Sequence, residues 1–364
     1  MPNKIGALYL HIPFCDHICS YCDFTKLFYF KKYEKPYLEA LKKEIKSYNI
    51  NKVNTLYIGG GTPTSLSDEG FEDILSFASK YLANDYEFTV EANAENLTDA
   101  KLHLMKKYGV NRLSIGVEST SNKTLKEIGR HHTWLDAKEA ISDAKKLGFD
   151  NINIDLIYGF KGESLEQLKK DLENFIKLDI DHISIYSLII EQGSILFAKG
   201  EKEQNEEDSR KYYETILNYL RKHGYERYEV SNFARNKKYS KHNLVYWHNK
   251  EYFGCGLGAS GYVNGFRYTN TKNLDEYIKC NYVANKEKVT KKTLLTYYLL
   301  TNLRLESGFS REEFKETFGK DFYEMFKDKI IKFSLEKYFN ISEDKISLND
   351  EGILLMDFIL LKLL

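Results

Sequence analysis

The chain has 364 residues, of which 42% are hydrophobic and 29% charged, a composition typical of a soluble globular protein. Lysine plus arginine and aspartate plus glutamate both number 53, so no net charge favours nucleic acid or an anionic membrane as a partner. The most apolar stretch, residues 353–364, is too short for a membrane span and carries Asp357 and Lys362, which predicts a buried terminal helix. The opening residues MPNKIGALYLHIPF are too short and too interrupted for a signal peptide.

Short apolar segments alternate with helical patterns through the first half of the chain. Strands are predicted at 6–12, 54–61, 86–93, 111–118, 151–159 and 181–190, and helices at about 35–48, 71–82, 97–109, 135–147 and 164–178. This spacing suits right-handed βαβ crossovers and a parallel sheet. Periodicity alone allows either a partial (β/α) barrel or an open doubly wound sheet.

The alternation ends near residue 200, which divides the chain into three predicted regions. Residues 1–200 form the α/β region, and residues 201–290 begin with a charged helix and continue as short aromatic strands and loops over one surface. Residues 291–364 are rich in helix, with one short strand at 345–350. Helices followed by a small strand pair predict a winged-helix-like α+β domain at the carboxyl end.

Three of the five cysteines, Cys15, Cys19 and Cys22, lie in a loop that directly follows the first predicted strand. The clustering indicates metal ligation in a reducing, cytoplasmic setting, with packing roles for Cys255 and Cys280. A zinc site is one alternative, with His11 or His17 completing four ligands. An iron–sulfur cluster is the other, and three thiolates on a four-iron cube leave one iron open to a further molecule.

The sequence YLHIPFCDHICSYCDF at 9–24, followed by GGGTPT at 59–64, resembles the radical S-adenosylmethionine (SAM) superfamily. More narrowly it resembles the HemN/HemW branch, which contains oxygen-independent coproporphyrinogen III dehydrogenase and haem chaperones. The resemblance covers nearly the whole chain. It implies a partial (β/α)6 barrel and a [4Fe–4S] cluster on Cys15, Cys19 and Cys22, with SAM bound to the open iron.

Further predicted cofactor residues lie at the ends of successive strands, where parallel α/β folds bind ligands. Bare glycines allow close approach of backbone to a ligand. The resemblance implies that SAM is bound by Gly60, Gly61, Thr62, Glu91, Glu118, Arg130 and Asp155, with Tyr9 beside the cluster. A structural alternative for the charged residues is a buried ion pair between Arg130 and Asp155. The branch usually has glutamine at position 118, and an ionised glutamate cannot donate a hydrogen bond.

The segment KHNLVYWHN contains His242 in an HNxxYW pattern that marks the haem chaperones of this branch. Imidazole is a common axial ligand of haem iron, although a histidine among aromatic residues is also typical of a protein core. The dehydrogenase has a further cysteine where this chain has Phe24, and an N-terminal extension for which the residues before the first predicted strand leave no room.

The resemblance therefore predicts a haem chaperone rather than an enzyme, with haem bound at His242 and passed to acceptor haemoproteins such as respiratory cytochromes. Membrane association would be transient, and nucleic acid is not an expected partner. The enzyme alternative is oxygen-independent coproporphyrinogen III dehydrogenase, a radical SAM enzyme of haem biosynthesis. A zinc-stabilised binding module is a third alternative, and it would contain no iron.

Overall fold

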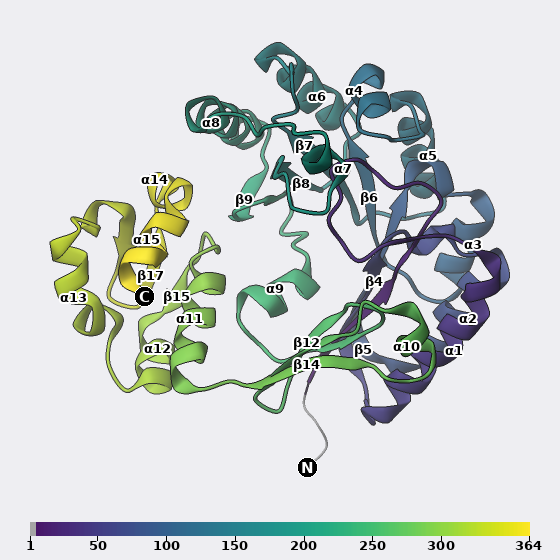
Figure 1. Ribbon diagram of the computed structural model, residues 1–364. Coiled ribbons are helices and arrows are strands. Elements are labelled where there is room, and N and C mark those ends of the chain that lie inside the picture. Colours follow the sequence, from purple (N-terminus) through teal and green to yellow (C-terminus); the bar gives the residue numbers. More distant parts are fainter. Residues whose placement is uncertain (1–4) are drawn as a thin grey trace.

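The computed structural model describes residues 5–364, so the predictions for the opening residues lie partly outside the described part of the chain. Six parallel strands form the centre of one curved sheet in sequential order (Figure 1): β1 Ala7–Ile12, β4 Val53–Gly60, β5 Leu82–Asn93, β6 Arg112–Glu118, β7 Ile152–Tyr158 and β8 His182–Ser187. These are the six predicted strands. A doubly wound sheet would reverse its strand order at a switch point, and the sequential order excludes that alternative.

Helices cover the outer, convex side of the sheet (Figure 1): α1 Lys31–Ser47, α2 Asp68–Ala78, α3 Asp99–Lys107, α4 Asn122–Glu127, α5 Trp134–Lys146 and α6 Leu165–Lys177. Ser67, Thr98, Thr133 and Ser164 accept a backbone N–H through their side chains and so begin four of these helices. The helices and the strands bury one continuous apolar core. The fold is therefore the predicted partial (β/α)6 barrel.

Residues after 200 extend the barrel sheet as well as cover it. β11 Phe253–Cys255 pairs in parallel with β1, while β10 Asn232–Ala234 pairs antiparallel with β8 and with β9 Glu226–Glu229. The order β11-β1-β4-β5-β6-β7-β8-β10-β9 has no pairing between its two ends, so this sheet of the described chain stays open. The sequence predicted covering strands here, because the periodicity of a short strand does not reveal which sheet it joins.

The remaining elements form two smaller units. After α7 Ile195–Ala198 and α8 Glu206–Lys222, the strands β12 Ser260–Val263, β13 Phe266–Asn270 and β14 Val283–Lys288 form an antiparallel sheet, with α10 Leu274–Ile278 between the last two. The carboxyl-terminal unit has its own core, built from α11 Lys291–Asn302, α12 Arg311–Phe318, α13 Phe322–Lys332, α14 Asp350–Leu354 and α15 Met356–Leu363 around the strands β15 Phe309–Ser310, β17 Lys345–Leu348 and β16 Phe339–Ile341. The strand predicted at 345–350 is β17. Across residues 5–364, each helix is too short or too polar to cross a bilayer.

The short helix α9 Lys241–Trp247, which carries the HNxxYW pattern, lies on the inner side of the curved sheet (Figure 1). Glu87 pairs with Thr55, near the amino end of β4, and accepts hydrogen bonds from the backbone N–H groups of Lys241 and His242, both at 3.0 Å. His242 is fully buried; its Nδ1 lies 2.9 Å from the Thr55 hydroxyl and its Nε2 lies 2.6 Å from the Tyr246 hydroxyl. The helix therefore fills the barrel from the amino ends of the strands, and His242 fixes it there.

Replacing His242 by alanine should reduce the free energy of unfolding by roughly 2–3 kcal/mol, because it opens a cavity and leaves two buried hydroxyls without a partner. Urea unfolding measures this change. Asn243→Ala, in a half-buried position on the same helix, is the matched control and should cost less than about 0.5 kcal/mol. Equal, small effects of both substitutions would contradict the structural role of His242.

Candidate cofactor site

The three clustered cysteines lie on a loop at the carboxyl end of β1. The short strands β2 Phe14–Cys15 and β3 Leu27–Phe28 pair in parallel and close the base of this loop. Ser20 anchors its middle, since the Ser20 amide and hydroxyl both donate to the Ile128 carbonyl, at 2.9 and 3.1 Å. All three thiols are free of disulfide bonds. Burial raises the pKa of Cys15 to about 11 and also raises that of Cys22, so a cationic partner is required to stabilise the thiolates.

The histidines considered for a zinc site do not join the cysteines. His11 is buried, with Nδ1 3.0 Å from the Tyr9 hydroxyl and Nε2 2.7 Å from the Thr25 carbonyl, while the exposed His17 stacks on His131 at 3.4 Å. Within residues 5–364, no three histidine, cysteine or acidic side chains converge on a position for one metal ion. A four-iron cluster has a different requirement, because each thiolate binds a different iron.

The GGGTPT segment at the end of β4 lies directly against the cysteine loop. The Gly61 amide donates to the Ile12 carbonyl at 2.8 Å, and the Thr62 amide donates to the Phe14 carbonyl at 2.7 Å. A Cβ atom on Gly61 would lie 2.8 Å from the Cys15 sulfur, and Gly60 has a φ of +127°. Both positions therefore require glycine, the first for space and the second for its backbone conformation.

Acidic side chains of the next strands, Glu91 and Asp155, are half-buried and hydrogen-bonded. Glu91 accepts from the Tyr57 hydroxyl at 2.7 Å and from the Gly60 amide at 3.0 Å, and burial raises its pKa to about 7. Asp155 is half-buried and accepts from the Asn153 side chain at 2.8 Å; burial raises its pKa as well. These groups bind a proton more readily than exposed carboxylates do, and a bound cation would reverse that tendency.

Arg130 joins the carboxylates to the cysteine loop. Its guanidinium donates to Asn93 at 3.0 Å and to the Cys19 sulfur at 3.6 Å, and it lies 3.8 Å from Glu118. The buried partner of Arg130 is therefore Glu118, and the alternative pair with Asp155 is absent from the ion pairs of residues 5–364.

Glu118 follows a bulge in β6 and has a φ of +69°, a strained conformation for a residue other than glycine. Its carboxyl accepts from the Tyr21 hydroxyl at 2.9 Å. Burial raises the pKa of Glu118, while the charge of Arg130 acts in the opposite direction. A protonated Glu118 can donate a hydrogen bond, as the glutamine usual at this position would.

The structure brings most of the predicted site residues to one cavity of about 440 Å³: Cys15, Cys19, Cys22, Gly60, Gly61, Thr62, Glu91, Glu118, Arg130 and Asp155. Tyr9 and His242 do not line it. They lie deeper in the barrel, with their rings 6.5 Å apart. Sequence reasoning missed Asn93, which donates to the Thr62 hydroxyl at 3.1 Å, and Tyr21. Their positions in the sequence could have indicated them, because Asn93 ends the VEAN segment that contains Glu91 and Tyr21 lies between two of the cysteines.

A partial parallel barrel with a three-cysteine loop and a glycine turn at the carboxyl ends of its strands defines the radical SAM class. Comparison with known proteins agrees, since residues 9–175 match the radical SAM superfamily and residues 289–355 match the HemN C-terminal domain. The fold resembles that of coproporphyrinogen III oxidase (HemN) from Escherichia coli, with a TM-score of 0.86 and 20% identity over 100% of this chain and 91% of that one.

Relatives with higher identity define the family. The chain is 38% identical to the heme chaperone HemW of Lactococcus lactis over 97% of its own length and 95% of that protein's. It is 36% identical to the heme chaperone HemW of Bacillus subtilis, over 96% of each. The chain belongs to the HemW family within the radical SAM superfamily.

Family membership implies a [4Fe–4S] cluster and SAM as cofactors, and the cavity suits both. Three free thiols that line one cavity fit a cluster that accepts one thiolate per iron. The glycine turn leaves backbone accessible beside Cys15, and the raised pKa of Glu91 indicates a carboxyl that a cationic ligand would stabilise. Cys15, Cys19 and Cys22 would hold the cluster, and Gly60, Gly61, Thr62 and the charged strand-end residues would hold SAM.

After anaerobic reconstitution the protein should contain about four irons per chain, bound by the three loop cysteines. Cys22→Ser should remove most of this iron, whereas Cys280→Ser, a half-buried cysteine after α10, is the matched control and should retain it. Iron and acid-labile sulfide analysis gives the result. Zinc in place of iron, or iron loss in the control alone, would contradict the assignment.

Glu91 should make the metal-free chain less stable as the pH rises. Its pKa of about 7 in the folded state exceeds the ordinary value of 4.5, so the folded chain holds a proton that the unfolded chain loses between pH 4.5 and 7. Glu91→Gln should flatten this decline and raise the free energy of unfolding at pH 8 by about 1–2 kcal/mol. The same substitution should weaken SAM binding to the cluster-loaded protein. Urea unfolding at several pH values measures the first effect, and a steeper decline in the variant would refute it.

Proposed function

We propose that this protein binds haem and passes it to acceptor haemoproteins such as respiratory cytochromes, with a SAM-ligated [4Fe–4S] cluster in the same chain. The observation that carries the proposal is the near full-length similarity, at 38% and 36% identity, to two proteins named heme chaperone HemW. A match over the barrel alone would support only the superfamily. Here the alignments also include the residues after 200 and the carboxyl-terminal unit.

The cluster loop supports delivery of haem over its synthesis. Phe24 stands where the dehydrogenase of this branch has a further cysteine, and its side chain is 66% exposed and lines the cofactor cavity. Neither remaining cysteine can replace it, because Cys255 is buried in the barrel sheet and Cys280 follows α10. The similarity to E. coli HemN, at 20% identity, supports the shared fold alone.

That His242 is the haem ligand stays a prediction, and it would require a rearrangement of α9. Both of its ring nitrogens are engaged, and burial lowers its pKa to about 3, so the imidazole is neutral. Ligation through Nε2 would first break the hydrogen bond to Tyr246, and a haem would reach the ring only if α9 left the barrel. Release of α9 would also expose Glu87, which accepts two of its amides.

The residues of this chain provide the remaining requirements of the cofactor site. Arg130 donates hydrogen bonds to the Cys19 sulfur and to Asn93 and forms an ion pair with Glu118, and Thr62 donates to the Cys15 sulfur at 3.6 Å. The bare backbone of Gly60 and Gly61 leaves room for the amino-acid part of SAM, and Glu91 is placed to receive its ammonium group. A [4Fe–4S] cluster on Cys15, Cys19 and Cys22 would, when bound and reduced, be able to supply an electron to SAM. The cytoplasm is the expected compartment.

Coproporphyrinogen III incubated anaerobically with the cluster-loaded protein, SAM and reductant should remain unconverted, because the chain lacks the fourth cysteine of the dehydrogenase. Product analysis by chromatography and mass spectrometry gives the result, with E. coli HemN as the positive control. Haem titration of the same preparation should give a saturable complex. Formation of protoporphyrinogen would overturn the chaperone proposal in favour of the enzyme alternative, and absence of haem binding would leave it without its cargo.

A further inference from the structure

Helix α9 has two faces with different surroundings. His242 and Tyr246, four residues apart, face the barrel and bond to each other. Leu244 and His248, also four residues apart, line a separate cavity on the side of the carboxyl-terminal unit. The imidazole on this side is partly open to solvent, whereas the ring of His242 is fully buried. Of the two histidines of HNLVYWHN, His248 is the one that a ligand can reach without displacing the helix.

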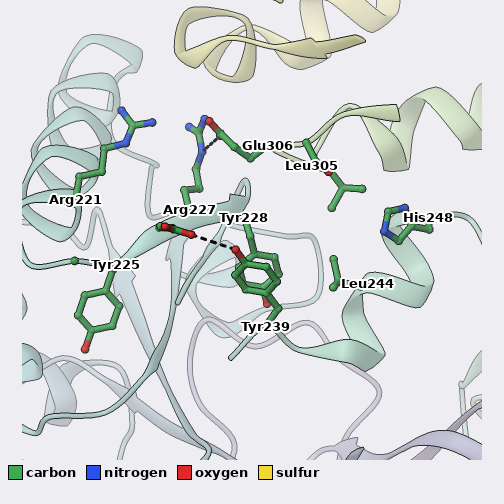
Figure 2. Close-up of a pocket in the computed structure, with 12 residues that line it drawn as sticks. Arg221, Tyr225, Arg227, Tyr228, Tyr239, Leu244, His248, Leu305 and Glu306 are labelled. Carbon is green, nitrogen blue, oxygen red and sulfur yellow. Dashed lines mark hydrogen bonds and ion pairs between the residues drawn. The ribbon is translucent and has the colours of Figure 1, made fainter. Parts of the chain in front are cut away.

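Figure 2 shows this cavity, which has a volume of about 730 Å³, within the range of small-molecule and cofactor sites. Tyr228 and Tyr239 stack on each other at 4.4 Å and form one side, and His248 stands on the other. Leu244 from α9 and Leu305 from the segment after α11 contribute apolar surface between them (Figure 2). The cavity therefore combines flat aromatic and aliphatic walls with one accessible imidazole.

The cations of this cavity are already neutralised. Arg221 makes a two-pronged bond to Asp350, at 2.8 and 3.0 Å, and Arg227 bonds to Glu306 and to Asp350. Glu226 adds a further negative charge to the lining. Among the described residues that line the cavity, no unpaired cation remains for a phosphate-bearing ligand. The cavity instead has an imidazole beside apolar side chains, which suits a flat ligand that carries a metal ion. The acidic groups of such a ligand would remain in water at the open side of the cavity.

The imidazole is in the form that binds a metal. Burial lowers the pKa of His248 and the charge of Lys250 acts in the same direction, whereas Glu313 and a hydrogen bond with Asn302 act against them. The net shift favours the neutral imidazole, which can bind a metal. The interface that forms the cavity is well defined, because the Val230 amide donates to the Arg304 carbonyl at 3.1 Å and the Glu306 amide donates to the Tyr228 carbonyl at 3.1 Å.

We infer that the cavity between α9, β9 and the carboxyl-terminal unit binds an iron porphyrin, with His248 as the axial ligand and the Tyr228–Tyr239 pair against the ring. The inference rests on the proposed function, since it names where that function would hold its haem. The axial ligand in this inference is His248, at the carboxyl end of α9, and not His242, which packs inside the barrel.

Titration of the cluster-loaded protein with ferric protoporphyrin IX tests the inference, with difference absorption for affinity and resonance Raman spectroscopy for the axial ligand. His248→Ala should weaken binding at least about tenfold and remove the histidine–iron signature. Leu244→Arg places a larger side chain in the cavity and leaves the axial ligand His248 unchanged, and it should weaken haem binding as well. His103→Ala, an exposed histidine on α3, is the matched control and should bind as the wild type does.

The outcomes separate the inference from the function on which it rests. Wild-type affinity and an unchanged spectrum in both His248→Ala and Leu244→Arg would overturn the site and leave the haem function standing. Loss of the histidine–iron signature in His242→Ala alone would mean that haem binds by opening α9, and would also overturn the inference. Failure of the wild-type protein to bind ferric protoporphyrin IX would remove the proposed function itself.

Discussion

The cofactor site depends on the parallel register of the barrel strands, because that register brings their carboxyl ends to one edge. Pairing of Ile12 with Gly60 places the cysteine loop beside the glycine turn, and pairing of Asn93 with Gly116 places Glu91 beside the strand that ends at Glu118. A shift of one residue in the pairing of a strand would turn side chains such as that of Glu91 to the helix-covered face of the sheet. Residues more than a hundred positions apart, such as Cys19 and Arg130, meet only because the sheet keeps this alignment.

The helix α9 fills the opposite end of the barrel, and this changes the meaning of the HNxxYW pattern. The buried imidazole of His242 packs in the barrel with both nitrogens engaged, and its neighbours Thr55 and Glu87 belong to the strands that continue to Gly60 and Glu91. The residues of the HNxxYW pattern thus pack inside the barrel near the amino ends of the strands, at the opposite end from the cofactor cavity. The other face of α9 remains available to a ligand. One short helix therefore joins the barrel to the cavity at the carboxyl-terminal unit.

Alternation of strand and helix predicted the strands of a parallel sheet and a common edge for the polar residues at their ends. The resemblance to the radical SAM superfamily, and not this alternation, indicated which of those residues bind the cofactors. The sequence did not predict that β9, β10 and β11 extend the sheet, since short aromatic strands give no sign of their partners. Nor could it predict the surroundings of Tyr9 and His242. On a helix of only seven residues the sequence does not show which side faces the core, and the partners Thr55 and Glu87 are more than 150 positions away.

If this chain carries haem as cargo, it should transfer that haem to an acceptor protein. The cluster-loaded protein would be saturated with haem and mixed with an apo-cytochrome and an excess of apomyoglobin, which captures haem released into solution. After separation, the haem content of each protein is measured. We expect the cytochrome to acquire haem despite the apomyoglobin. Haem recovered on apomyoglobin alone would show simple release into solution and would contradict a role in delivery.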